Sequence, residues 1–267
     1  GLNIGANNPD GSCKTPQDWT TAFRTIQSLP GQNFTSARLF ASSDCNTLAN
    51  AVPAALALGT QILVGVWATD NAHFEAEKAA LREAISRLGK DWILAISVGS
   101  EDLYRKDNPP ENLAQQIYDV RGMVREMGVG VEVGHVDTWN AWVDGANTAV
   151  IKACDFIGTD GYPYWQGSTP EQASDVFWQS VNDVRDVVNN VSSGKWVWVT
   201  ETGWPVTGDN YGASIPDIAN AQSYWKNVAC AAFEQVHMFW YAYQDFNAKP
   251  SFGILGPDLK PLYDLGC

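Results

Sequence analysis

The sequence predicts an α/β protein in which a single (β/α)8 TIM barrel occupies residues 1–267 as one domain. Three observations lead to this fold class: a chain length suited to one large core, short apolar strands at regular intervals, and helical segments between them. The 267 residues, of which 45% are hydrophobic, suffice for one substantial core and do not require a second domain.

Eight short runs of apolar or β-branched residues are predicted as strands. Successive runs start roughly 25 to 41 residues apart, which is the length of one strand, one helix and their loops. This alternation fits a closed parallel barrel better than an open sheet of fewer strands. The strands are expected to begin near Leu2, Ser36, Gln61, Trp92, Val129, Phe156, Val197 and Val236.

Helical periodicity marks four of the intervening segments, 16–28, 72–88, 112–127 and 169–191. Thr15 and Pro16 form an N-cap and first-turn pair for the first segment, while Gly89 and Gly128 stop the second and third. Only about two dozen residues follow the last strand, and they are rich in proline and glycine, so we expect a short or irregular eighth helix.

The charge and aromatic content narrow the class of ligand. A formal net charge of −13, with 17 Lys and Arg residues, excludes the basic clusters on which nucleic-acid binding depends. Twelve tryptophans exceed the needs of a core of this size, and their flat faces suit stacking on sugar rings. No apolar run is long enough for a membrane span. The N-terminal residues are predicted as a strand, so we expect any targeting peptide to have been removed.

The cysteines indicate an oxidising compartment. None of the five forms a C-x-x-C pair, which argues against zinc or dithiol chemistry. Glycosylation sequons at Asn33 and Asn190 point the same way, toward a secreted or cell-wall protein. We expect the pairs Cys13–Cys45 and Cys230–Cys267, with Cys154 buried and unpaired.

Acidic residues gather where predicted strands end, and in a barrel of this kind those ends form the reactive face. They are Asp44, Asp70, Glu101, Asp137, Asp160, Glu201 and Asp245. Alternation along residues 93–101 places Glu101 with the small residues that face the barrel interior. Glu201 ends the other candidate strand, just before Gly203. Two carboxyl groups suffice to hydrolyse a glycosidic bond without metal or cofactor.

Three motifs resemble glycoside hydrolase family 17, in its fungal branch of endo-β-1,3-glucanases and β-1,3-glucanosyltransferases. They are Val-Gly-Ser-Glu-Asp-Leu-Tyr-Arg at 98–105, Thr-Glu-Thr-Gly-Trp-Pro at 200–205, and Arg-Leu-Phe at 38–40 followed by Asp-Cys-Asn at 44–46. The resemblance implies a (β/α)8 fold and retention of anomeric configuration. It also implies Glu101 as acid/base and Glu201 as nucleophile, acting on internal β-1,3-glucosidic bonds with possible transfer to a second glucan.

Further residues are expected to bind the substrate or to orient the carboxylates. Tyr162 matches a family position beside the nucleophile, and Arg38 stands where it could orient a carboxylate. Tryptophan next to aspartate is typical of a sugar subsite, as in Trp67 with Asp70 and Trp139 with Asp137. The complete set is Arg38, Trp67, Asp70, Ser100, Tyr104, Asp137, Trp139, Tyr162, Trp165 and Trp204. The three histidines, His73, His135 and His237, lack metal-ligand spacing, so no metal is expected.

Two positions depart from the family pattern and keep other functions open. Ser100 stands where many relatives have asparagine, and Tyr241 stands where much of the family has glutamate. The alternatives are a catalytically weak β-glucan-binding wall protein, or a barrel glucanase for β-1,4 or mixed-linkage glucan. The expected partner is a β-1,3-glucan polysaccharide or oligosaccharide, bound by a monomer.

Overall fold

The computed structural model describes residues 1–233 and 235–267, and its strands close into one parallel barrel in the order β1 to β8. The strands are β1 (Leu2–Asn3), β2 (Ser36–Leu39), β3 (Gln61–Val66), β4 (Ile93–Ser100), β5 (Val133–Thr138), β6 (Phe156–Asp160), β7 (Trp196–Thr202) and β8 (Met238–Trp240). Each strand pairs with its neighbours in sequence, and β1 pairs with β8 to close the circle. The predicted fold class is therefore confirmed.

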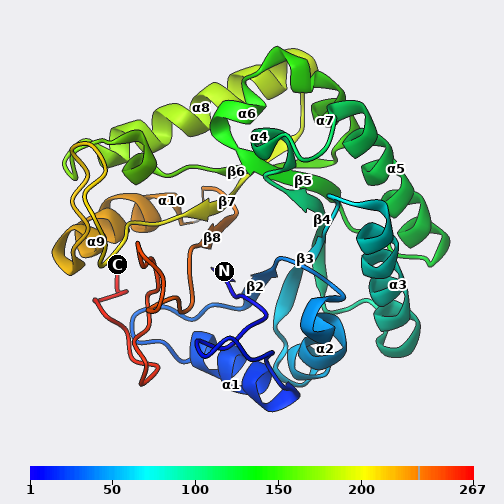
Figure 1. Ribbon diagram of the computed structural model, residues 1–267, viewed down its shortest axis with the longest axis horizontal. Coiled ribbons are helices and arrows are strands. Elements are labelled where there is room, and N and C mark those ends of the chain that lie inside the picture. Colours follow the sequence, from blue (N-terminus) through cyan, green and yellow to red (C-terminus); the bar gives the residue numbers. More distant parts are fainter. Residues whose placement is uncertain (234) are drawn as a thin grey trace.

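Helices surround the strands in chain order, as Figure 1 shows. The longer ones are α1 (Pro16–Gln27), α2 (Thr47–Leu58), α3 (Asn71–Leu88), α5 (Pro110–Glu126) and α8 (Ala173–Val191). Shorter ones are α4 (Asp102–Arg105), α6 (Trp139–Trp142), α7 (Thr148–Ala153), α9 (Ile218–Tyr224) and α10 (Cys230–Ala232). Four single-turn elements complete the set: η1 (Asp44–Asn46), η2 (Gly145–Asn147), η3 (Pro163–Gln166) and the π-helical η4 (Trp225–Ala229).

Two apolar layers hold the barrel together. The inner layer is small and includes Phe156 stacked on Trp198, with 4.5 Å between ring centroids. The larger outer layer lies between strands and helices, and Ile96 and Val98 of β4 belong to it, whereas Ala95 belongs to the inner layer. This division follows the alternation predicted for that strand.

The predicted elements are confirmed with shifts at their ends. Thr15 is the N-cap of α1, as expected, and it also forms a capping box in which its hydroxyl accepts from the backbone N–H of Asp18. The fifth strand begins at Val133 rather than near Val129, because the intervening residues close the end of α5. There the Arg125 guanidinium donates to the carbonyls of Val129 and Val131, at 2.7 and 2.8 Å.

The end of the chain has no helix after β8 within the described residues, which agrees with the irregular segment predicted there. The tail instead packs on the preceding helices, where the Trp225 indole N–H donates to the Leu265 carbonyl at 3.1 Å. Disulfides join Cys230 to Cys267 and Cys13 to Cys45, as predicted, and Cys154 is buried and free. Such bonds form and persist in oxidising compartments. No helix among the described residues is long and apolar enough to cross a membrane.

Candidate active site

The two glutamates predicted from the strand ends meet at the carboxyl end of the barrel. Glu101 directly follows β4, and Glu201 lies at the end of β7. One carboxylate oxygen from each of Glu101, Asp160 and Glu201 lies within 4.8 Å of the other two. Retaining glycosidases place their two catalytic carboxyl groups about 5 to 5.5 Å apart, so this separation suits a double-displacement mechanism.

Two side chains contact the carboxylate of Glu201, and both stabilise negative charge on it. The Arg38 guanidinium forms an ion pair with Oε1, and the Tyr162 hydroxyl donates to Oε2 at 2.8 Å. Burial and the negative charge of Glu201 raise the pKa of Tyr162 well above its ordinary value, so the phenol remains a donor. The predicted contacts of Arg38 and Tyr162 are both present.

Glu101 is in a different electrostatic position. Its side chain is 19% exposed, and the Arg105 guanidinium donates to Oε2 at 2.5 Å. Loss of hydration, followed by the negative charge of Glu201, raises the pKa of Glu101 to about 7. The raised pKa leaves Glu101 about half protonated at neutral pH, while the buried Arg38 guanidinium stabilises the carboxylate of Glu201, as acid/base and nucleophile roles require.

Asp160 is a site residue that the sequence placed among the strand-end acids without a role. It is 1% exposed, and its Oδ1 accepts from the Thr200 hydroxyl at 2.8 Å. Burial, together with the charge of Glu201, raises the pKa of Asp160 well above the ordinary value for an aspartic acid. The raised pKa favours the neutral form of Asp160, which limits the negative charge gathered around Glu101 and Glu201. No local motif marks this role, which depends on its distance from Glu201.

Asp137 was expected to contact the sugar, and the structure contradicts this. Its side chain is fully buried and accepts from the backbone N–H groups of Leu103 and Tyr104, at 2.8 and 3.3 Å. These are the first-turn amides of α4, the helix that begins immediately after Glu101. Asp137 therefore fixes the backbone that carries the acid/base instead of binding substrate.

His135 completes this buried support. Its Nδ1 lies 2.7 Å from the Val98 carbonyl and its Nε2 lies 2.9 Å from Asp137 Oδ2. Because both ring nitrogens face acceptors, the ring satisfies both as an imidazolium. Burial opposes that charge, but the hydrogen bond and charge of Asp137, with Asp102 and the Val98 carbonyl, outweigh it and raise the pKa of His135.

Two cavities flank the catalytic pair and share one wall. The first has a volume of 480 Å³ and is lined by Glu101, Glu201, Ser100, Trp67 and Tyr241, among others. The second has a volume of 370 Å³ and is lined by Glu101, Tyr104, Trp139 and Gln166, among others. Tyr162 and Trp165 line both. The predicted residues Trp67, Ser100, Tyr104, Trp139, Tyr162 and Trp165 thus all lie at the cleft, and Arg38 lies beneath it.

Two other predicted subsite residues have structural roles instead. Trp204 is 1% exposed, packs against Tyr164 and Tyr224, and donates its indole N–H to the Ile215 carbonyl at 2.9 Å. Asp70 caps α3 by accepting from the His73 backbone N–H at 2.8 Å. Neither lines the two cavities. The prediction of Trp204 as a subsite wall is wrong, because its ring is buried in the core. Asp70 is exposed, and its role as a sugar ligand stays a prediction.

Tyr241, which replaces the family's usual glutamate, contributes an aromatic wall to the first cavity. Its ring meets Tyr162 and Phe252 edge-on, with centroids 6.0 and 5.8 Å away. The nearby carboxylate of Asp245 is held by the Ser251 hydroxyl at 2.7 Å and the Phe252 N–H at 2.7 Å. Tyr241 and Phe252 therefore form an aromatic wall on this side of the cleft, and the hydrogen bonds to Asp245 fix the backbone that carries Phe252.

Comparison with known proteins agrees with this geometry. The family model described as the BtgE/BtgC glycoside hydrolase domain matches residues 1–254. The chain belongs to this glycoside hydrolase family. A probable glucan endo-1,3-beta-glucosidase of Aspergillus oryzae is 40% identical over 294 residues, covering 100% of this chain and 62% of that protein. A glucan 1,3-beta-glucosidase of Saccharomyces cerevisiae is 39% identical over 239 residues, covering 86% of this chain and 75% of that protein.

The chain is similar in structure to solved enzymes of glycoside hydrolase family 17. The glycoside hydrolase family 17 β-1,3-glucanosyltransferase of Rhizomucor miehei superposes with a TM-score of 0.87 at 28% identity, covering 100% of this chain and 97% of that one. An active-site mutant of that enzyme, in complex with laminaritriose, gives a TM-score of 0.85 at 28% identity, covering 97% and 94%. The resemblance read from the three motifs is confirmed. The chain spans less than two thirds of the length of the Aspergillus oryzae relative.

Proposed function

We propose that this barrel is the catalytic domain of an extracellular retaining enzyme that cleaves internal β-1,3-glucosidic bonds of glucan. The observation that supports it most directly is the pair Glu101 and Glu201, whose oxygens lie within 4.8 Å of each other. The pKa of Glu101 is raised to about 7, and Glu201 is paired with the buried Arg38. The relatives named as glucan endo-1,3-beta-glucosidase and β-1,3-glucanosyltransferase support the substrate class. The two disulfides support the oxidising location.

The reaction follows from which groups line which cavity. Glu201 lines only the first cavity, so the sugar whose C1 it attacks lies there, while Glu101 lines both and can reach the bridging oxygen. Glu101 donates its proton to that oxygen as the bond to C1 breaks, and Glu201 forms the glycosyl ester. The leaving glucan departs through the second cavity. Glu101, now ionised, takes a proton from the incoming hydroxyl, which attacks C1 and releases Glu201.

The test is the turnover of Glu201→Gln on β-1,3-linked oligosaccharides. Glutamine keeps the size of the side chain but cannot form the ester, so we expect turnover to fall by 10³-fold or more, which is about 4 kcal/mol. A variant that kept most of the wild-type turnover would overturn the proposal. Glucan bound without new reducing ends or longer products by the wild-type protein would favour the wall-protein alternative. A panel of β-1,3, β-1,4 and mixed-linkage oligosaccharides decides the linkage.

A second candidate function, transfer to another glucan, is favoured by the aromatic lining of the second cavity. Trp165 and Tyr104 are 45% and 55% exposed there, beside Trp139. Exposed rings on the leaving-group side hold a sugar after the first step, and a held sugar competes with water for the glycosyl ester. The two outcomes share one intermediate and differ only in the acceptor.

The matched test compares Tyr104→Ala, which alters the second cavity but not the first, with Trp196→Ala at high oligosaccharide concentration. Trp196 is also exposed, at 66%, but begins β7 and therefore lies at the opposite end of the barrel from Glu201. Loss of one stacking face should lower the ratio of longer products to hydrolysis about 2- to 12-fold in Tyr104→Ala. The Trp196→Ala ratio should remain at the wild-type value. An unchanged ratio in both variants would contradict the transfer assignment.

A further inference from the structure

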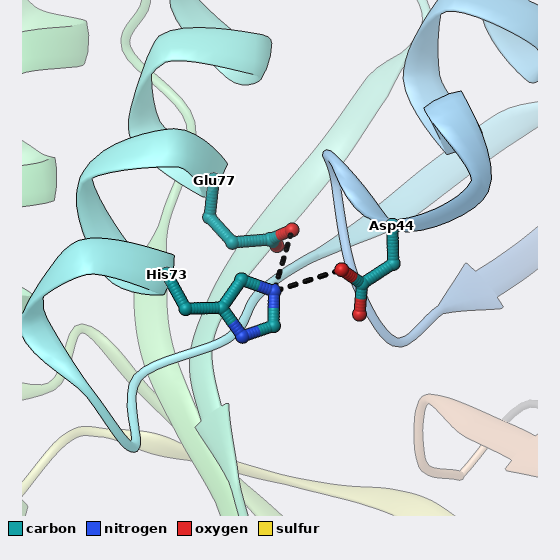
Figure 2. A group of neighbouring side chains, drawn as sticks. All are labelled: Asp44, His73 and Glu77. Carbon is teal, nitrogen blue, oxygen red and sulfur yellow. Dashed lines mark hydrogen bonds and ion pairs between the residues drawn. The ribbon is translucent and has the colours of Figure 1, made fainter.

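Outside the catalytic cleft, three metal-ligating side chains converge between the loops that follow β2 and β3. Figure 2 shows His73 and Glu77 of α3 facing Asp44 of η1. His73 Nε2 lies 2.8 Å from Asp44 Oδ1 and 3.6 Å from Glu77 Oε1. The proposed reaction does not use this cluster.

The separations fit one tetrahedral zinc ion. Zinc bonds to imidazole nitrogen and carboxylate oxygen are about 2.0 to 2.1 Å long, so neighbouring ligand atoms around a tetrahedral ion lie about 3.3 Å apart. The two measured separations, 2.8 and 3.6 Å, lie on either side of that value. All three ligand atoms lie within 4.8 Å of one another, so small rotations of exposed side chains suffice.

Glu77 is already fixed in the way that metal-binding carboxylates usually are. It is fully buried, and it accepts from the backbone N–H groups of Ser42 and Ser43, each at 2.6 Å, and from that of Trp67 at 3.0 Å. The Ser43 hydroxyl, at 2.5 Å from Oε1, can rotate to make room for an ion. Glu77 would therefore be a buried ligand whose position is already fixed by the backbone around it.

The two remaining ligands are open to solvent, which supplies the entry path and a fourth ligand. The Asp44 and His73 side chains are 54% and 27% exposed. When the His73 proton resides on Nδ1, its Nε2 carries a lone pair directed at the other two ligands. A site with one imidazole, two carboxylates and water suits zinc better than calcium or magnesium, which prefer oxygen ligands alone.

We propose that Asp44, His73 and Glu77 bind one zinc ion that joins the loops after β2 and β3. Because Glu77 also holds the backbone of Trp67, which lines the first cavity, the bound ion would stabilise one edge of the cleft. The site stands on its own geometry and does not depend on the proposed glucan chemistry.

The test is a titration of the chelator-treated, full-length protein with zinc alone, followed by calorimetry and by thermal unfolding. We expect one equivalent to bind, and a zinc concentration 100 times the Kd to raise Tm by about 5 to 11 °C. Asp44→Asn and His73→Gln should each weaken binding about tenfold or more. The matched control is His237→Gln, which removes the other exposed histidine and should bind zinc as the wild type does.

Two results would overturn the proposal: no saturable zinc binding by the wild-type protein, or an affinity that His73→Gln leaves unchanged. Loss of binding in His237→Gln instead would assign the ion to a different surface. Cobalt provides a second readout, because a tetrahedral cobalt complex absorbs strongly in the visible range. That absorption should appear with the wild-type protein and be absent with Asp44→Asn. Equal absorption by the wild-type protein and Asp44→Asn would also refute the assignment.

Discussion

Replacing the acid/base Glu101 with glutamine should stabilise the protein above neutral pH. The folded state raises the pKa of Glu101 from 4.5 to about 7, chiefly by loss of hydration and secondly by the charge of Glu201. A pKa difference of about 2.5 corresponds to about 3 kcal/mol at 1.36 kcal/mol for each pKa unit. The raised pKa already includes the opposing charge of Arg105, and glutamine avoids the net penalty, so we expect a gain of about 1 to 3 kcal/mol at pH 8.

The gain has a defined pH dependence. Below pH 4.5 the carboxyl group is protonated in both the folded and the unfolded state, so the wild type carries no penalty. As the pH rises, the unfolded state ionises first and the penalty grows until the folded state ionises near pH 7. Chemical denaturation at pH 4 and pH 8 measures the difference in unfolding free energy between Glu101→Gln and the wild type. The control is Glu126→Gln, at an exposed position, which should change stability by less than about 0.5 kcal/mol. A Glu101→Gln variant that is less stable than wild type at pH 8 would refute the reasoning.

Three further predictions concern the support of the site. Tyr162→Phe removes a 2.8 Å hydrogen bond to the nucleophile and should lower kcat about 10- to 100-fold with little change in KM, by steady-state kinetics. His135, with its raised pKa, should give the ¹⁵N NMR signature of an imidazolium at pH 7. The contribution of the charged ring to folding stability is complete below about pH 6.5 and is lost as the pH rises through the pKa of His135 in the folded state. A neutral ring at pH 7 would disprove the network. Cys230→Ala opens a bridge with a sequence separation of 37 and should lower the free energy of unfolding by about 2 to 5 kcal/mol in denaturant titration, whereas an unchanged midpoint would contradict a stabilising role.

The barrel was predictable because strand periodicity repeats along the chain and records which side of each strand is buried. That is why Glu101 could be placed in the barrel mouth from Ala95, Ser97 and Gly99 alone. Helix α2 was not among the four predicted ranges, and its sequence contains Pro53, which usually interrupts a helix. Packing of residues such as Leu48, Ala51 and Val52 against the core outweighs that local preference.

The site was only partly predictable, because sequence position near a strand end does not fix the direction in which a side chain leaves the loop. Trp204 follows β7 and Asp137 lies in β5 one residue before its end, yet the first packs in the core and the second accepts from the first turn of α4. The role of Asp160 was not predicted, because no motif marks a carboxyl group whose role comes from two distant glutamates. The cluster of Asp44 with His73 was not predicted either, because its members come from η1 and α3, which are far apart in sequence.

The most direct test of the central claim is to trap the glycosyl ester. A β-1,3-linked substrate with fluorine at C2 of the reacting sugar and a good leaving group should react once and remain attached. Fluorine slows both steps, while the good leaving group keeps the first step fast enough for the ester to accumulate. Intact-mass measurement and peptide mapping should locate one sugar adduct on Glu201, absent from Glu201→Gln. An adduct on another carboxylate, or turnover with inverted anomeric configuration, would contradict the assignment of nucleophile and acid/base.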